Sequence, residues 1–157
     1  MSRFARSGGL LALLVSALLV TGCGGEQRLT KAQYEKQVRA LYGEVRAAFQ
    51  ATRGVKGAVL AERISTASTK LRIASQQLEA RFEPPQEVEE HNEELAEGML
   101  ALSVELDGLV QALDRGQKRA LQRYNARIPR NKEIERMAEA AEEMKFMGYD
   151  LGVLAQE

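Results

Sequence analysis

Apolar residues recur at helical spacing over four long stretches of this chain. Within each stretch the steps between them are mostly three or four residues, a period that places side chains on one face of an α-helix. The stripes are Tyr34, Val38, Leu41, Val45 and Phe49; Leu60, Ile64, Ala67, Leu71, Ala74 and Leu78; Val88, Asn92, Leu95, Met99, Leu102, Leu106, Leu109 and Leu113; and, in two pieces, Leu121, Tyr124 and Ile128 followed by Ile134, Met137, Ala138, Ala141, Met144 and Met147. No run of alternating β-branched residues typical of a strand is present, so the pattern predicts an all-α fold.

Capping and breaking residues mark where these helices should begin and end. Thr30 and Gln33 have the spacing of a capping box, which predicts the start of the first helix at Thr30. Further expected boundaries lie at Gly54, at Pro84-Pro85, at Gly116 and at Gly148. Pro129 should interrupt the last helix, because proline lacks a backbone N–H and clashes with the preceding turn, and Asn131 is suited to cap the piece that follows.

Short connections between these stretches predict an up-down-up-down four-helix bundle over residues 30–157, with its fourth helix interrupted at Pro129. The stripe at 88–113 is the most regular and forms a heptad seam, in which Asn92 is a polar residue at a core position. Such a residue can fix the register of neighbouring helices, or it can turn to the edge of the seam. The alternative architecture is a pair of helical hairpins that completes its core as a homodimer through the helix at 88–113.

The first 22 residues have a different character from the rest. Arg3 and Arg6 precede thirteen uncharged residues at 8–20, a run shorter than the ~20 residues that a membrane-spanning helix needs. A basic start followed by a short apolar run and small residues is typical of a secretory signal peptide. The sequence therefore predicts that residues 1–22 are removed during export.

The residues at the expected cut are Leu19-Val20-Thr21-Gly22-Cys23, with an aliphatic residue, then a small residue, then the only cysteine. This segment resembles the lipobox of bacterial lipoproteins. The resemblance implies cleavage between Gly22 and Cys23 and attachment of lipid to the Cys23 thiol. The competing interpretation is an uncleaved N-terminal anchor helix followed by a chance cysteine.

Lipidation would divide the chain into a signal peptide at 1–22, a lipidated cysteine with a short tether at 23–29, and a helical domain at 30–157. Two acyl chains hold a protein stably on a bilayer, so we expect a lipid-anchored protein on the extracytoplasmic face of a bacterial membrane. With a single cysteine no disulfide can form within the chain, and packing alone must stabilise the domain.

Charge and composition exclude several function classes. The chain has 22 basic and 22 acidic residues, and loss of Arg3 and Arg6 with the signal peptide leaves 20 against 22, a formal charge of −2. This balance argues against general nucleic-acid binding, which needs a strongly basic domain. The sequence has no glycine-rich phosphate loop, no C-x-x-C-H haem motif and no clustered catalytic residues, so we expect neither enzymatic activity nor a cofactor.

One candidate site lies in an acidic segment, residues 82–97, which has no lysine or arginine and contains the only histidine. Glu87, His91 and Glu94 are spaced to share one helix face, and together they could hold a divalent metal weakly. The competing interpretation is that the acids favour the positive end of a helix dipole and are solvated.

A second candidate site is basic. In an up-down bundle the turns after the first and third helices lie at the same end, which would bring together Arg53, Lys56, Arg115, Lys118 and Arg119. We call these five residues the basic tip. The acidic turn at Pro84-Pro85 would lie at the other end, near the membrane. The tip could bind an envelope protein or an anionic envelope polymer, or it could be a solvated surface whose cations suit the C-terminal end of a helix.

The mature part of the chain resembles a loose group of small all-helical bacterial lipoproteins of unassigned function. The matching segments are residues 29–34, which carry the capping box, and the Pro84-Pro85 pair with residues 87–91. This resemblance implies fold and location but no activity. The leading hypothesis is a non-enzymatic interaction or structural protein of the cell envelope, and the alternative is a ligand or metal carrier that uses the His91 cluster or the bundle core.

Overall fold

The computed structural model describes residues 28–117 and 119–152, and within them every regular element is helical. There are five α-helices: α1 (Lys31–Gln50), α2 (Gly57–Ala80), α3 (Glu89–Asp114), α4 (Ala120–Arg127) and α5 (Lys132–Phe146). Two single 3-10 turns, η1 (Gln86–Val88) and η2 (Ile128–Arg130), precede α3 and α5. The predicted all-α fold is confirmed. The predicted signal peptide, Gly22, Cys23 and Lys118 lie outside the described residues.

Local sequence determines where the helices begin. Thr30 accepts a hydrogen bond from the Gln33 backbone N–H, and the Gln33 side chain reaches back to the Thr30 N–H at 2.9 Å, so the predicted capping box is present. Asn131 caps α5 by accepting from the backbone N–H groups of Glu133 and Ile134. Pro129 lies in η2, which separates α4 from α5. The predicted interruption is confirmed, and the described residues therefore form five α-helices rather than four.

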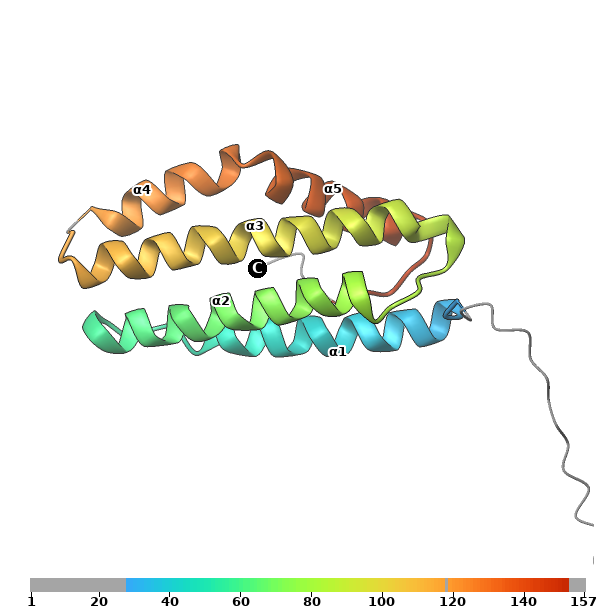
Figure 1. The fold of residues 1–157 in the computed structure, drawn as a ribbon, viewed down its shortest axis with the longest axis horizontal. Coiled ribbons are helices and arrows are strands. Elements are labelled where there is room, and N and C mark those ends of the chain that lie inside the picture. The colour runs from blue at the N-terminus through green and yellow to red at the C-terminus, as the bar shows by residue number, and fades with distance from the viewer. Residues whose placement is uncertain (1–27, 118, 153–157) are drawn as a thin grey trace, which may run out of the picture.

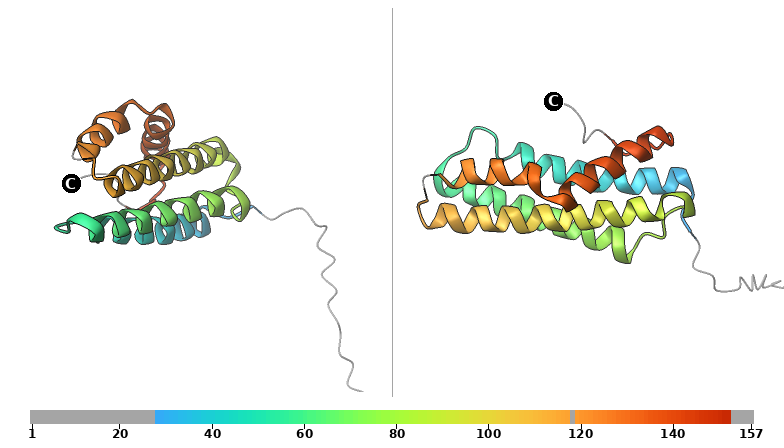
Figure 2. Two further views of the ribbon diagram at one scale, coloured as in Figure 1. Left: turned by 60° about the vertical axis from the view of Figure 1, so that its left-hand side comes forward. Right: turned by 90° about the horizontal axis from the view of Figure 1, so that it is seen from above.

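The helices lie side by side in an elongated arrangement (Figures 1 and 2). α1 and α2 form an antiparallel hairpin, α3 packs along α2, and α4 and α5 follow one another along the opposite side of α3. The turns after α1 and after α3 meet at one end of the molecule (Figure 1, left). The start of α1, the connection from α2 to α3 and the end of α5 meet at the other end.

The core follows the first three predicted stripes. In the fourth, Leu121 and Met147 are exposed, at 46% and 41% of their accessible area, and Ala120 and Ala140 are buried instead. The fully or nearly fully buried side chains of the core include Tyr34, Val38, Val45, Ala67, Leu71, Leu78, Val88, Leu95, Met99, Leu106, Leu109 and Met144. Phe49, Leu60, Leu102 and Leu113 are only partly buried but pack against this core. The central helix α3 is covered on one side by α2 and on the other by α4 and α5.

α3 and α5 come into very close contact at Gly98. A Cβ atom placed on Gly98 would lie 2.2 Å from the Met137 Cβ and 2.8 Å from the carbonyl oxygen of Glu133. Both atoms belong to or are attached directly to the α5 backbone, so no side-chain rotation could relieve the overlap. Glycine at this position is therefore a requirement of the packing.

Residues 147–152 leave the end of α5 and return across α1, and we call them the C-terminal strap. The Lys31 ammonium donates to the Met147 carbonyl oxygen at 3.3 Å and lies 4.4 Å from the centre of the Tyr149 ring. Arg39 pairs with Asp150 at 2.7 Å, while Tyr149 and Leu151 are buried. The strap therefore fastens the end of α5 to the first turns of α1.

Candidate functional site

Four members of the basic tip are described, and all four are exposed at one end of the molecule (Figure 1). Arg53 lies in the turn after α1, Lys56 is the N-cap residue of α2, Arg115 is the C-cap residue of α3 and Arg119 is the N-cap residue of α4. None of the four forms an ion pair with another described residue. The topology thus brings together cations from two turns that are about sixty residues apart in the sequence.

The positions of these cations distinguish between the two interpretations of the tip. Arg115 follows the last turn of α3, where the helix dipole favours a positive charge. Lys56 and Arg119, in contrast, stand at helix N-termini, where the dipole disfavours a cation, and neither side chain makes a capping hydrogen bond. Dipole stabilisation therefore explains Arg115 but leaves Lys56 and Arg119 unexplained.

The opposite end of the molecule is acidic and holds the first described residues. The Arg28 guanidinium donates to the Pro84 carbonyl oxygen at 3.2 Å and pairs with Glu89 at 2.9 Å, and the Leu29 N–H donates to the Glu83 carbonyl oxygen at 2.7 Å. The hydrogen bond to Glu89 raises the pKa of Arg28. The chain that leads to the predicted lipid anchor is therefore fastened to the connection between α2 and α3.

A cleft of about 480 Å³ opens beside this connection. Its wall contains Arg28, Leu78, Phe82, Pro84 and Asn92 together with Glu79, Glu83, Glu89, Glu93 and Glu97. Five carboxylates against one guanidinium make the cleft strongly acidic. The two ends of the molecule therefore carry charge of opposite sign.

The three residues of the predicted metal cluster have different neighbours. His91 lies between two carboxylates, with its Nδ1 3.5 Å from Glu94 and its Nε2 3.5 Å from Glu143 of α5. Glu87 instead accepts a hydrogen bond of 2.7 Å from the Tyr149 hydroxyl, and this bond, its own backbone N–H and Lys31 lower the pKa of Glu87. Across residues 28–117 and 119–152 no three His, Cys, Asp or Glu side chains are grouped so as to hold a metal ion.

Asn92 occupies a buried position where three helices meet. Its side-chain oxygen accepts from the Tyr34 hydroxyl at 2.9 Å, and its amide donates to the Leu78 carbonyl oxygen at 3.1 Å. Leu78 lies in the last turn of α2, where carbonyl groups lack intrahelical partners. Asn92 therefore links α1, α2 and α3 at fixed register, as one of the two predicted roles requires, and does not turn to the edge of the seam.

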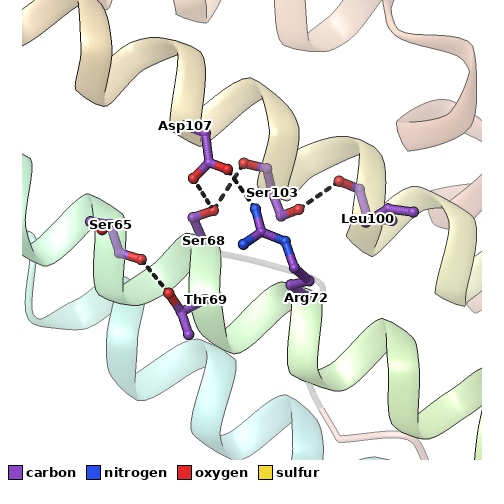
Figure 3. A network of polar contacts seen from close by, with 7 residues as sticks. All are labelled: Ser65, Ser68, Thr69, Arg72, Leu100, Ser103 and Asp107. Atoms are coloured by element: carbon purple, nitrogen blue, oxygen red, sulfur yellow. Dashed lines mark hydrogen bonds and ion pairs between the residues drawn. The ribbon is translucent and has the colours of Figure 1, made fainter.

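A second polar cluster joins α2 to α3 and was not predicted (Figure 3). The buried Ser68 hydroxyl lies 2.5 Å from Asp107 and 3.0 Å from the Ser103 carbonyl oxygen, and Arg72 pairs with the other Asp107 oxygen at 2.5 Å. Both carboxylate oxygens of Asp107 are thus engaged, one by Ser68 and the other by Arg72. The cluster is suited to holding two helices together rather than to activating the serine hydroxyl.

Comparison with protein-family models, with curated proteins and with solved structures found no match to this chain. No helix in the described parts of the chain has both the length and the apolar character that a bilayer crossing requires. The two charged ends of the molecule, and the lipobox-like segment that precedes them in the sequence, are the features that bear on function.

Proposed function

We propose that this protein is a lipid-anchored lipoprotein on the extracytoplasmic face of a bacterial membrane, and that its helical domain presents the basic tip to an anionic partner. In this proposal residues 1–22 are cleaved, Cys23 carries the lipid, and α4 and α5 together serve as the fourth member of a helical bundle. The protein acts by binding, without enzymatic activity.

The length of the tether supports this orientation. Between Cys23 and Arg28 the chain can extend at most about 18 Å, and Arg28 is bound to the acidic end of the domain. That end would therefore stay close to the bilayer. The 26 residues of α3 span about 39 Å at 1.5 Å per residue, which would place the basic tip about that far above the acidic end.

The observation that carries the binding proposal is the set of cations at helix N-termini. Lys56 and Arg119 stand where the helix dipole disfavours a cation, yet they are exposed and without ion pairs, and their turns, which also carry Arg53 and Arg115, lie at one end of the molecule. A cluster of unpaired cations attracts anionic molecules over about one Debye length, ~8 Å at physiological salt. An anionic envelope polymer or an acidic surface of an envelope protein is the kind of partner that suits this end.

The test compares two variants with the same change in net charge. The tip variant carries glutamate in place of Arg53, Lys56, Arg115 and Arg119. The control variant carries glutamate in place of Lys36, Arg46, Arg130 and Lys132, which are exposed and form no ion pair with a described residue. Circular dichroism is used to check that both variants fold.

Binding is measured to immobilised poly(glycerol phosphate), as a model anionic polymer, and to proteins of envelope extracts. We expect the native protein and the control variant to bind in a salt-sensitive manner and the tip variant to lose binding to at least one of the two. Equal binding by the tip and control variants would show that the position of the charge does not matter and would refute the role of the tip.

A further inference from the structure

The most exposed large apolar side chain among the described residues is Phe146, at 89% of its full accessible area. It is the last residue of α5, and Met147 beside it is 41% exposed. Single exposed apolar residues are common on protein surfaces, so exposure alone assigns no role to Phe146. The position of Phe146 relative to the tether is what suggests a role.

The end of α5, where Phe146 lies, is at the same end of the molecule as the start of α1, close to where the described chain begins (Figures 1 and 2). The adjacent Met147 carbonyl oxygen accepts the hydrogen bond from Lys31, the first residue of α1, at 3.3 Å. The pairs formed by Asp150 and Tyr149 of the C-terminal strap then hold the end of α5 in this place. Phe146 is therefore presented from a fixed backbone close to the point where the tether leaves the domain.

We infer, on the basis of the proposed lipid anchorage, that Phe146 inserts into the interface of the bilayer and forms a second membrane contact beside the anchor. A tether that can extend at most about 18 Å would keep this end of the domain at the membrane surface, where an exposed aromatic ring meets the apolar layer beneath the headgroups. The neighbouring Lys145 is exposed, and lysine can bury its aliphatic stem beside the ring while its ammonium stays among the headgroups.

A bilayer suits Phe146 better than a protein partner or a second copy of the chain does. A specific protein interface buries about 800 Å² on each partner, far more than one aromatic ring and a half-exposed methionine can supply. A lipid-anchored domain needs much less, because the anchor already holds the ring at high effective concentration near the membrane. Insertion would restrict how the domain tilts and keep the basic tip directed away from the bilayer.

The sequence contains no tryptophan, so a Phe146→Trp variant of the full chain carries a single fluorescent reporter. The variant is reconstituted in vesicles of phosphatidylethanolamine and phosphatidylglycerol, with or without bromine on the acyl chains. Two matched controls are Val59→Trp, on the first turn of α2 near the basic tip, and Val104→Trp, on the exposed side of α3; their native side chains are 47% and 60% exposed. All three sites are exposed, so the substitutions should not disturb the fold.

We expect the Phe146→Trp emission to move to shorter wavelength on vesicles and to be quenched by the brominated lipid, and neither control to respond. Unchanged and unquenched emission at position 146 would overturn the inference, as would equal or stronger quenching at position 104, which would mean that the domain lies on its side.

Mass spectrometry of the same samples keeps this result separate from the question of lipidation. If the Cys23 thiol is bare, it is coupled to a maleimide lipid, which is selective because no other cysteine is present. Insertion is then tested on an anchored chain in either case. A failure of insertion on the coupled chain counts against Phe146 alone, and a bare native thiol counts against the proposed lipoprotein.

Discussion

Replacement of Gly98 by alanine tests the close packing of α3 on α5. The added methyl carbon would lie 2.2 Å from the Met137 Cβ and 2.8 Å from the Glu133 carbonyl oxygen, so α5 would have to move away. Overpacking of this kind costs about 1–3 kcal/mol. We expect a cost near the upper end of this range, because the two atoms that the methyl group would meet cannot move without the α5 backbone. The higher helix propensity of alanine offsets about 1 kcal/mol of this cost. We expect the free energy of unfolding to fall by about 2 kcal/mol and the melting temperature by roughly 8 °C.

Gly43 of α1 provides the matched control, because it is exposed and a Cβ atom there would meet no atom within 4 Å. Gly43→Ala should therefore raise the free energy of unfolding by about 1 kcal/mol through helix propensity alone. Both variants are unfolded in urea and followed by far-UV circular dichroism. Their free energies of unfolding can be compared if the slope of the free energy against urea concentration is the same in both. If Gly98→Ala stabilised the protein as much as Gly43→Ala does, the close contact between α3 and α5 would be refuted.

Three further predictions use the same urea assay. Tyr34→Phe should lower the free energy of unfolding by about 1–2 kcal/mol, because it leaves the buried Asn92 oxygen without that donor, and it should cost much less in an Asn92→Ala background. Asn131→Ala should cost about 1 kcal/mol by removing the cap of α5; no loss would argue against the cap. Burial raises the pKa of Tyr124 from 10.0 to about 12, so the unfolded chain releases this proton at lower pH than the folded one. Stability should therefore fall as the pH rises from about 10 to about 12, and Tyr124→Phe should make that fall smaller; an unchanged fall would exclude this contribution.

Features that depend on neighbouring residues in the chain could be predicted from the sequence. The capping box of Thr30 and Gln33, the cap at Asn131 and the break at Pro129 each follow from the backbone chemistry of a few consecutive residues. The apolar stripes were also readable, because a helix buries one face whatever it packs against. The up-down topology, which was inferred from the short connections, also predicted that the turns after the first and third helices would lie at one end.

Features that depend on how one helix is rotated against another could not be read in this way. Spacing along α3 placed Glu87 beside His91, but Glu87 lies in η1, and the carboxylate on the other side of His91 is Glu143 of α5. The contact at Gly98 likewise follows from the approach of α5. In the structure Ala140 and Met144 are buried, which puts Glu143 at the edge of the buried face of α5, but the predicted stripe contained Ala141 rather than Ala140.

The contacts of the C-terminal strap with α1 could not be predicted from the sequence either. Its short sequence contains an aromatic residue and an aspartate, but nothing in it indicates that Tyr149 would contact Lys31 or that Asp150 would pair with Arg39, more than a hundred residues earlier. Such contacts arise only once the end of α5 and the start of α1 are brought to the same end of the molecule.

We propose that lipid attached to one sulfur atom holds the domain on a membrane. The most direct test is mass spectrometry of the native protein purified from the membrane fraction of the producing bacterium. We predict a chain that begins at Cys23 and carries the added mass of a diacylglycerol on its thiol. A chain that begins at Met1, or one with an unmodified thiol at position 23, would contradict the claim.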